Sequence, residues 1–326
     1  MAKMTMVQAL NLALRQEMEK DDRVIVLGQD VGVDGGVFRV TDGLIERFGE
    51  QRSLDTPLAE SGIVGMAIGM AVYGLRPVCE IQFSGFSYHN FHQIESHASR
   101  LRWRSQGRFL VPMVLRTPYG GGVRALEHHS ESREAFWSHM PGLKMVIPSG
   151  PRNARALLVS AIRDPDPVIF YESKALYRAF REEVPEEEET MPLGKPRIVK
   201  EGKDLTMISY GAMMRPTLEA AAELQDKEGV EAEVIDLLTI SPLDDAPFTE
   251  SIRKTGRAVV VHEAPRSFGP GAEIVSRVME KSFYYLEAPI ARVTGFDIII
   301  PLFSRERAYL PDAKRILRAA RKVLSA

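Results

Sequence analysis

The chain has 326 residues, of which 44% are hydrophobic and 26% are charged, and its formal net charge is −2. This composition is typical of a globular protein long enough for two domains, and it excludes the disordered and fibrous classes. The small net charge gives no indication of nucleic acid or of an anionic membrane surface as a partner.

The first half of the chain alternates buried strands with amphipathic helices. Residues 1–18 lack the long apolar core of a signal peptide, so we expect a cytoplasmic protein. Helical patterns occupy residues 6–20, 61–72, 90–104 and 151–162. Strand patterns occupy residues 23–28, 76–83, 112–116, 143–147 and 167–171. This alternation predicts a parallel sheet covered by helices on both faces.

Glu60 stands immediately before a helix rich in small and apolar residues. Gly62, Gly65 and Gly69 each cost roughly 1 kcal/mol in a helix interior, so we expect something to approach this face closely. An acid against such a surface loses water, which disfavours its charged form and suits it to donate a proton. The alternative is that Glu60 merely favours the positive end of the helix.

Cysteine and histidine supply the other reactive side chains. Cys79 is the single cysteine and lies in a predicted buried strand, where we expect an inert hydrophobic side chain. His128 and His129 follow the flexible residues 120–123, and a loop of this kind presents either a titrating imidazole or a merely structural surface. Three further histidines lack metal-ligand spacing and are expected on helix or loop surfaces: His89, His92 and His97.

The alternating pattern stops over residues 178–203. The acidic run at 182–189, followed by prolines, is expected to form an exposed, solvated linker. A second α/β unit then follows, with strands at 205–210, 232–236, 258–262 and 290–293 and helices at 215–228 and 271–283. We therefore predict two domains, residues 1–190 and residues 191–326.

Several common catalytic motifs are missing from the sequence. No Gly-x-x-x-x-Gly-Lys-Ser/Thr loop is present, and no Gly-x-Gly-x-x-Gly follows a strand, which argues against a nucleoside triphosphate site and a dinucleotide site. There is also no Cys-x-x-Cys, no His-Glu-x-x-His and no Gly-x-Ser-x-Gly, which argues against metalloprotease and hydrolase chemistry.

A set of co-linear motifs extends from about residue 4 to the C-terminus. They are Thr-Pro-Leu-Ala-Glu-Ser-Gly-Ile-Val-Gly at 56–65, Glu-Ile-Gln-Phe at 80–83, His-Ser at 129–130, Pro-Gly-Leu-Lys at 141–144, Leu-Tyr-Arg at 176–178, Lys-Thr-Gly-Arg at 254–257 and Glu-Ala-Pro at 287–289. On these motifs the chain resembles the beta subunits of two-subunit 2-oxo acid dehydrogenases. These are the thiamine-diphosphate-dependent, decarboxylating components of the pyruvate and branched-chain complexes.

The resemblance implies a fold and a set of site residues. Residues 1–190 are expected to form a transketolase-type pyrimidine-binding domain with a parallel sheet. Residues 191–326 are expected to form the transketolase C-terminal α/β domain, with subunit and acyltransferase contacts. Leu58, Glu60, Gln82 and Phe86 match cofactor-contacting positions, Phe86 being the aromatic residue against the pyrimidine.

Two residues match the family's catalytic positions. The Glu at the position of Glu60 hydrogen-bonds a ring nitrogen of the aminopyrimidine and favours the imino tautomer that removes the thiazolium proton. The histidine at the position of His129 positions the 2-oxo acid or its covalent intermediate and assists transfer to lipoamide.

A structural cation site of some family members also has matching positions here. The ligands would be backbone carbonyls near Val111, Met113, Ala161, Asp164 and Asp166, and the expected ion is monovalent, with potassium as the candidate.

The chain also departs from the family pattern at three places. Gln29 stands where the family usually has a Glu, and His92 replaces a usual Asp. Residues 296–301 replace a more polar Thr-Pro-Tyr/Phe-Pro segment. These departures bear on substrate preference and local electrostatics rather than on the cofactor.

The family holds the cofactor diphosphate through magnesium bound by a Gly-Asp-Gly motif and a later Asn. No Gly-Asp-Gly occurs in this chain, and a diphosphate without a cation or donors would be strongly unfavourable. We therefore expect an alpha subunit to bind magnesium and the diphosphate of thiamine diphosphate, with the active site at the interface of an α2β2 tetramer.

The expected reaction is decarboxylation of a 2-oxo acid with reductive acylation of lipoamide, carried by the lipoyl domain of a dihydrolipoyl acyltransferase. Phe86 and residues 83–86 favour pyruvate, branched-chain 2-oxo acids come second and acetoin third. A hypothesis of a different class is a non-catalytic scaffold that docks the acyltransferase. Neither nucleic acid nor a membrane is expected as a partner.

Overall fold

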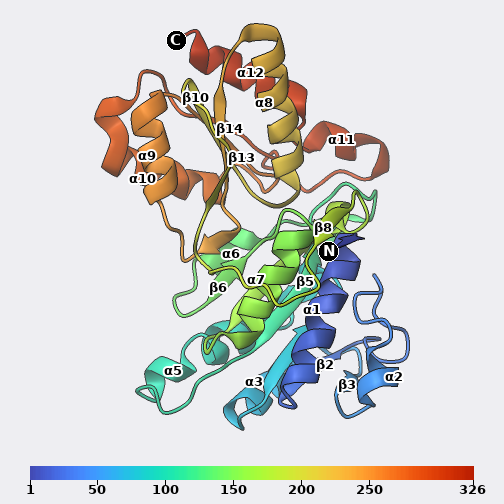
Figure 1. Ribbon diagram of the computed structural model, residues 1–326. Coiled ribbons are helices and arrows are strands. Elements are labelled where there is room, and N and C mark those ends of the chain that lie inside the picture. The colour runs from blue at the N-terminus through green and yellow to red at the C-terminus, as the bar shows by residue number, and fades with distance from the viewer. The chain divides into compact units, whose positions relative to one another are not determined.

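The computed structural model describes all 326 residues, which divide into two compact units (Figure 1). The first unit comprises residues 1–119 and 136–193, and the second comprises residues 120–135 and 194–326. Segment 120–135, which carries His129, is therefore grouped with the second unit although the chain around it belongs to the first. No helix has both the length and the apolar character needed to cross a bilayer.

The first unit is built on a sheet in which six of its strands follow the order β6-β7-β5-β4-β2-β3, with every pair parallel. The strands are β2 (Val24–Gly28), β3 (Ser53–Asp55), β4 (Arg76–Glu80), β5 (Val114–Tyr119), β6 (Lys144–Val146) and β7 (Val168–Ser173). Runs rich in Val, Ile and Leu, such as β2, are buried along their whole length, as parallel strands covered on both faces require.

The helices of the predicted pattern are present in this part of the chain. They are α1 (Met6–Lys20), α2 (Leu44–Phe48), α3 (Glu60–Val72), α4 (Phe91–Gln93), α5 (Leu101–Arg104), α6 (Glu134–Ser138) and α7 (Pro151–Arg163). Thr5 caps α1 in a reciprocal pair with Gln8, which fixes the start of that helix. Helix α1 packs along α7, and the two lie side by side (Figure 1).

The prediction of one continuous helix over residues 90–104 is wrong, because this segment is helical in separate short pieces. Between α4 and α5 the chain forms a π-helical turn, Ile94–Ala98, in which the Ser99 N–H donates to the Ile94 carbonyl at 3.0 Å. The Ser99 hydroxyl also donates to the Glu95 carbonyl at 2.8 Å. A serine that competes for backbone acceptors in this way interrupts a regular helix.

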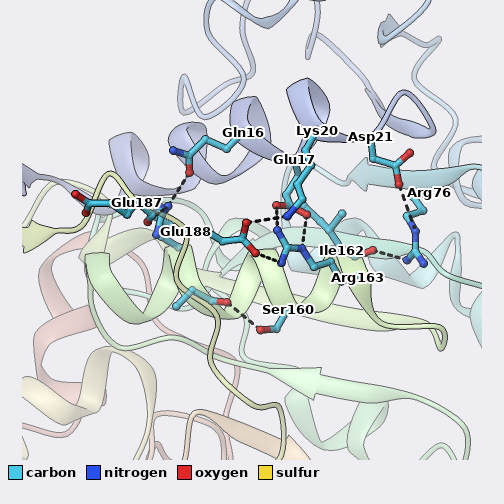
Figure 2. Close-up of polar contacts among 12 residues, drawn as sticks. Gln16, Glu17, Lys20, Asp21, Arg76, Ser160, Ile162, Arg163, Glu187 and Glu188 are labelled. Carbon is cyan, nitrogen blue, oxygen red and sulfur yellow. Dashed lines mark hydrogen bonds and ion pairs between the residues drawn. The ribbon is translucent and has the colours of Figure 1, made fainter.

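The acidic run at 182–189 is largely exposed, as predicted, but it is also held to the first unit by a strand pairing and by ion pairs. Residues Glu182–Val184 form β8, which pairs antiparallel with β1 (Ala2–Met4). Glu188 accepts from Lys20 at 2.7 Å and from Arg163 at 2.5 Å, which ties the run to α1 and α7 (Figure 2). These bonds lower the pKa of Glu188 to about 2. We call residues 182–189 the acidic strap.

The second unit has a five-stranded sheet of order β14-β13-β10-β11-β9, in which only the β9–β11 pair is antiparallel. Its strands are β9 (Arg197–Lys200), β10 (Leu205–Ser209), β11 (Ala232–Asp236), β13 (Ala258–Val261) and β14 (Ala291–Val293), and β12 (Thr239–Ser241) follows β11 in the chain. Its helices are α8 (Met214–Glu228), α9 (Ala246–Thr255), α10 (Pro270–Ser282), α11 (Glu306–Tyr309) and α12 (Ala313–Leu324). Helices α9 and α10 cover one face of this sheet, and α8 and α12 cover the other (Figure 1).

Candidate cofactor site

The predicted cofactor residues of the first unit gather at one edge of its sheet. Leu58 and Glu60 follow β3, while Gln82 and Phe86 follow β4. Strand β2 lies between β3 and β4, and its last residue, Gly28, pairs with the last residues of both neighbours. Because the carboxyl ends of parallel strands share an edge, these side chains lie where open α/β sheets bind their ligands.

Gln82 is held in place by a residue that the sequence did not single out. Its amide nitrogen donates to the Asp30 carboxylate at 2.8 Å, which joins the chain after β4 to the chain after β2. Asp30 has a backbone φ of 59°, in the left-handed region that is costly for most side chains. Asp30 could have been found from the sequence by its position, because it directly follows Gln29 at the end of a predicted buried strand.

The loop after β2 is fixed from a second side. The Asp55 carboxylate accepts from the Gly32 N–H at 2.6 Å and from the Val33 N–H at 3.0 Å. A Cβ at Gly32 would lie only 2.8 Å from the Asp55 carboxylate, so this close approach requires glycine.

Phe86 belongs to a small group of aromatic rings. Its half-buried ring meets Phe83 edge to face at a centroid distance of 5.7 Å, and Phe83 meets Phe38 in the same way at 5.6 Å. The Lys174 ammonium lies 5.8 Å from the Phe83 ring centroid. Such contacts fix ring orientation and favour a defined, flat, apolar surface at this edge.

Glu60 is the first residue of α3 and is only half-buried, while Leu58 is 70% exposed. The close approach expected along the glycine face of α3 is largely absent from this chain. A Cβ at Gly69 would meet nothing within 4 Å, and one at Gly65 would meet only the Gln93 side chain, at 3.7 Å. This chain alone therefore does not provide the apolar surroundings that we expected around Glu60.

A buried charge cluster lies directly behind this edge. The Arg116 guanidinium pairs with Glu80 at 2.7 Å and with both oxygens of Glu172 at 2.7 and 2.8 Å, and the Tyr177 hydroxyl donates to Glu172 at 2.7 Å. Burial raises the pKa of Glu80, against the lowering effect of Arg116. Hydrogen-bonded charges of this kind hold strands β4, β5 and β7 in fixed register. The sequence analysis did not predict this cluster, although each of the three apolar strands contains one of its charged residues.

Cys79 and the surface histidines agree with expectation. Cys79 is fully buried, and burial raises the pKa of its thiol to about 12, which makes it inert. His89, His92 and His97 are exposed.

His129 ends a short 3-10 turn, Glu127–His129, and is half-buried, whereas His128 is exposed. The loop that carries it belongs to the second unit, and Glu60 belongs to the first. Five residues further on, Glu134 at the start of α6 is fully buried and accepts from the Tyr210 hydroxyl at 2.8 Å, and burial raises the pKa of Glu134 to about 7.

Several carbonyls of the predicted cation site already take part in hydrogen bonds. The Val111 carbonyl accepts from the Met113 N–H at 2.8 Å, and the Ala161 carbonyl accepts from the Asp164 N–H at 3.3 Å. The Lys144 ammonium donates to both oxygens of the Asp164 carboxylate at 2.7 Å. Each carbonyl keeps a second lone pair, so the monovalent-cation site stays a prediction.

Comparison with known proteins agrees with this geometry. Residues 2–179 match the family model "Transketolase, pyrimidine binding domain", and residues 194–316 match "Transketolase, C-terminal domain". A solved structure described as a split gene transketolase, inactive beta4 tetramer, is similar with a TM-score of 0.82 at 22% identity, covering 99% of both chains. Fold and family matches therefore define a two-domain protein of the transketolase class, as predicted.

Relatives that match the chain over its full length identify the family within this class. The pyruvate dehydrogenase E1 component subunit beta of Acholeplasma laidlawii is 50% identical over 326 residues, covering 100% of this chain and 99% of its own length. The corresponding subunits of Staphylococcus epidermidis and Bacillus subtilis are 52% and 51% identical over 324 residues, with 99% of each chain covered. The chain belongs to the family of pyruvate dehydrogenase E1 beta subunits. This confirms the resemblance inferred from the motifs.

Proposed function

We propose that this chain is the pyrimidine-binding half of a thiamine-diphosphate-dependent pyruvate dehydrogenase E1 component. With an alpha subunit it catalyses oxidative decarboxylation of pyruvate and reductive acetylation of lipoamide on a dihydrolipoyl acyltransferase. The observation that carries the proposal is the gathering of Glu60, Gln82 and Phe86 at the carboxyl edge of one parallel sheet, in a chain related over its full length to E1 beta subunits.

The residues at this edge fit an aminopyrimidine. Such a ring has flat apolar faces and polar nitrogens on its rim, and the half-buried Phe86 ring offers a matching face. Glu60 supplies a carboxyl group for a ring nitrogen, and Gln82 is held by Asp30. The chain has no Gly-Asp-Gly motif, which supports assigning magnesium and the diphosphate to the alpha subunit.

The roles of the side chains follow from their chemistry. When bound, thiamine diphosphate supplies the electron sink that allows a 2-oxo acid to lose carbon dioxide. Glu60 holds a proton at its carboxyl oxygen and shares it with the pyrimidine nitrogen, and Leu58, Gln82 and Phe86 orient the ring. His129 orients the 2-oxo acid and exchanges a proton during transfer to the lipoyl group.

The exposed face of α3 supports the need for a partner chain. Gly62, Met66, Gly69 and Tyr73 follow one another at helical spacing and are all exposed, Tyr73 by 90%. We infer that another subunit of an α2β2 tetramer covers this face and so removes water from Glu60. The C-terminal domain would then remain for contacts with the acyltransferase.

Reconstitution with an alpha subunit tests this function. The purified pair, with magnesium and thiamine diphosphate, should decarboxylate pyruvate in the presence of an artificial electron acceptor and acetylate a lipoyl domain. Parallel assays with 3-methyl-2-oxobutanoate and acetoin should give lower kcat/KM values. Preference for either of these would replace pyruvate as the substrate, and failure to turn over any of the three would favour a non-catalytic scaffold.

A further inference from the structure

A buried carboxylate in the second unit is satisfied by the backbone of the His129 loop. Glu306, the first residue of α11, is 2% exposed. Its Oε1 atom accepts from the Gly122 N–H at 2.9 Å, and its Oε2 atom accepts from the Arg124 N–H at 3.1 Å. The Arg124 N–H also reaches the Oε1 atom at 3.3 Å, so the partners of this carboxylate are the two backbone N–H groups of the loop. Because a buried charge is costly without partners, Glu306 and the loop backbone depend on each other.

The loop has the backbone conformation that this contact requires. Gly122 has a φ of 93° and Arg124 a φ of 58°, both in the left-handed region. Alternation of backbone conformation of this kind turns nearby N–H groups toward one anion. Arg124 has a side chain and therefore adopts this conformation at a cost of roughly 1 kcal/mol. The contact with Glu306 offsets that cost.

A second carboxylate holds the loop on both sides of His129. Glu263 is 3% exposed, and its Oε1 atom accepts from the Gly121 N–H at 2.9 Å and from the Ser132 hydroxyl at 2.8 Å. A Cβ at Gly120 would lie 2.4 Å from the same oxygen. The segment between residues 121 and 132, with His129 inside it, is thus closed at its base by one side chain.

We propose that Glu306, together with Glu263, is a positioning residue that holds the 120–132 loop in the shape that presents His129. Neither residue is assigned a contact with substrate or cofactor. Because this role rests on the proposed function of His129, the test separates the anchoring of the loop from the chemistry of the histidine.

Trypsin cleavage of the full chain measures the anchoring directly. Arg124 is exposed, and cleavage after it requires the loop to open locally. Glu306→Gln replaces one of the two acceptor oxygens with an amide NH2, removes the negative charge, and so weakens the hold on the Gly122 and Arg124 N–H groups. We expect cleavage after Arg124, mapped by mass spectrometry, to become about tenfold faster. Glu273→Gln, the same change at an exposed position of α10, should leave the rate unchanged. An unchanged rate in Glu306→Gln would overturn the proposal.

The reconstituted enzyme measures the positioning. We expect His129→Ala to lower the ratio of lipoyl-domain acetylation to pyruvate decarboxylation, and Glu306→Gln to lower it in the same direction by about tenfold. Glu306→Asp keeps the charge with a shorter reach and should lie between wild type and Glu306→Gln, which keeps the test valid if Glu306→Gln folds poorly.

The outcomes distinguish the two claims. A normal ratio in Glu306→Gln and Glu306→Asp alongside an impaired His129→Ala would overturn the positioning role alone. A normal ratio in His129→Ala would overturn the proposed function of His129 and with it the positioning role, and the cleavage rates would still report whether Glu306 anchors the loop.

Discussion

The predicted cofactor residues of the first unit differ in how firmly this chain holds them. Gln82 is held by Asp30, and Phe86 packs on Phe83. Glu60 and Leu58 have no comparable support, since Leu58 is 70% exposed and Glu60 begins a helix with an open face. The residues proposed to orient the ring are thus held in place within this chain, whereas Glu60 is not, which agrees with the proposal that a partner subunit completes its surroundings.

Replacement of Glu60 tests its proton-transfer role. Glu60→Gln keeps the shape of the side chain and removes its ability to release a proton, so we expect pyruvate decarboxylation by the reconstituted enzyme to fall by about 100-fold or more. Steady-state assays with an artificial electron acceptor measure this. Glu46→Gln, an exposed position of α2, serves as the matched control. Full activity in Glu60→Gln would exclude the proposed mechanism.

Replacement of Asp30 tests the support of Gln82. Asp30→Ala removes the acceptor for the Gln82 amide, and loss of a hydrogen bond to a charged group costs about 1.5–3 kcal/mol. Since solvent replaces part of this bond, we expect half-saturation by thiamine diphosphate to rise by about tenfold in the reconstituted enzyme, with a smaller change in kcat. Asp34→Ala, an exposed carboxylate of the same loop, should behave as wild type. Equal half-saturation in both variants would contradict this support.

At the scale of elements, local pattern predicted most helices and strands but not their long-range partners. The limits of α1 and β11 agree with the predicted residues, because hydrophobic spacing and capping act within one element. The exposure of the acidic strap was predicted, but its ion pairs were not, because the basic partners, Lys20 and Arg163, lie far away in the sequence. The Arg116 cluster was missed for the same reason. Glycines in α3 predicted a close contact that the chain by itself does not contain.

The acidic strap should make stability depend on pH. The folded-state pKa of Glu188 is lowered to about 2 from an ordinary value of 4.5, so its contribution is complete above that ordinary value and is lost as pH falls toward 2. The difference in unfolding free energy between wild type and Glu188→Gln, measured by urea titration, should be constant near neutral pH and shrink below about pH 4.5. Glu186→Gln, in the same run, should show no such trend. A difference that grows on acidification would refute this assignment.

At the scale of the whole molecule, we propose that the chain provides one part of a binding site. The fold class and the family followed from sequence because many motifs are co-linear with the transketolase-type domains. The grouping of residues 120–135 with the second unit could not be predicted, because the contacts of Glu263 and Glu306 with this loop span more than 100 residues of sequence.

The lone chain should therefore bind cofactor weakly. Titration of the isolated chain with thiamine diphosphate and magnesium, followed by calorimetry, should give no heat that fits a Kd below about 100 μM, because the chain lacks the Gly-Asp-Gly motif expected to bind magnesium and the diphosphate. The same titration of the reconstituted pair should give a saturable signal. Tight binding by the isolated chain would show that it carries a complete site.

The pairing of β1 with β8 has a consequence for synthesis on the ribosome. The first residues of the chain have their strand partner only when residues 182–184 have emerged, so the first unit closes late. The segment with His129 acquires its hydrogen-bond partner even later, because Glu306 is translated near the end of the chain. During elongation this glycine-rich segment therefore lacks the two carboxylates that hold its backbone until synthesis of the chain is nearly complete.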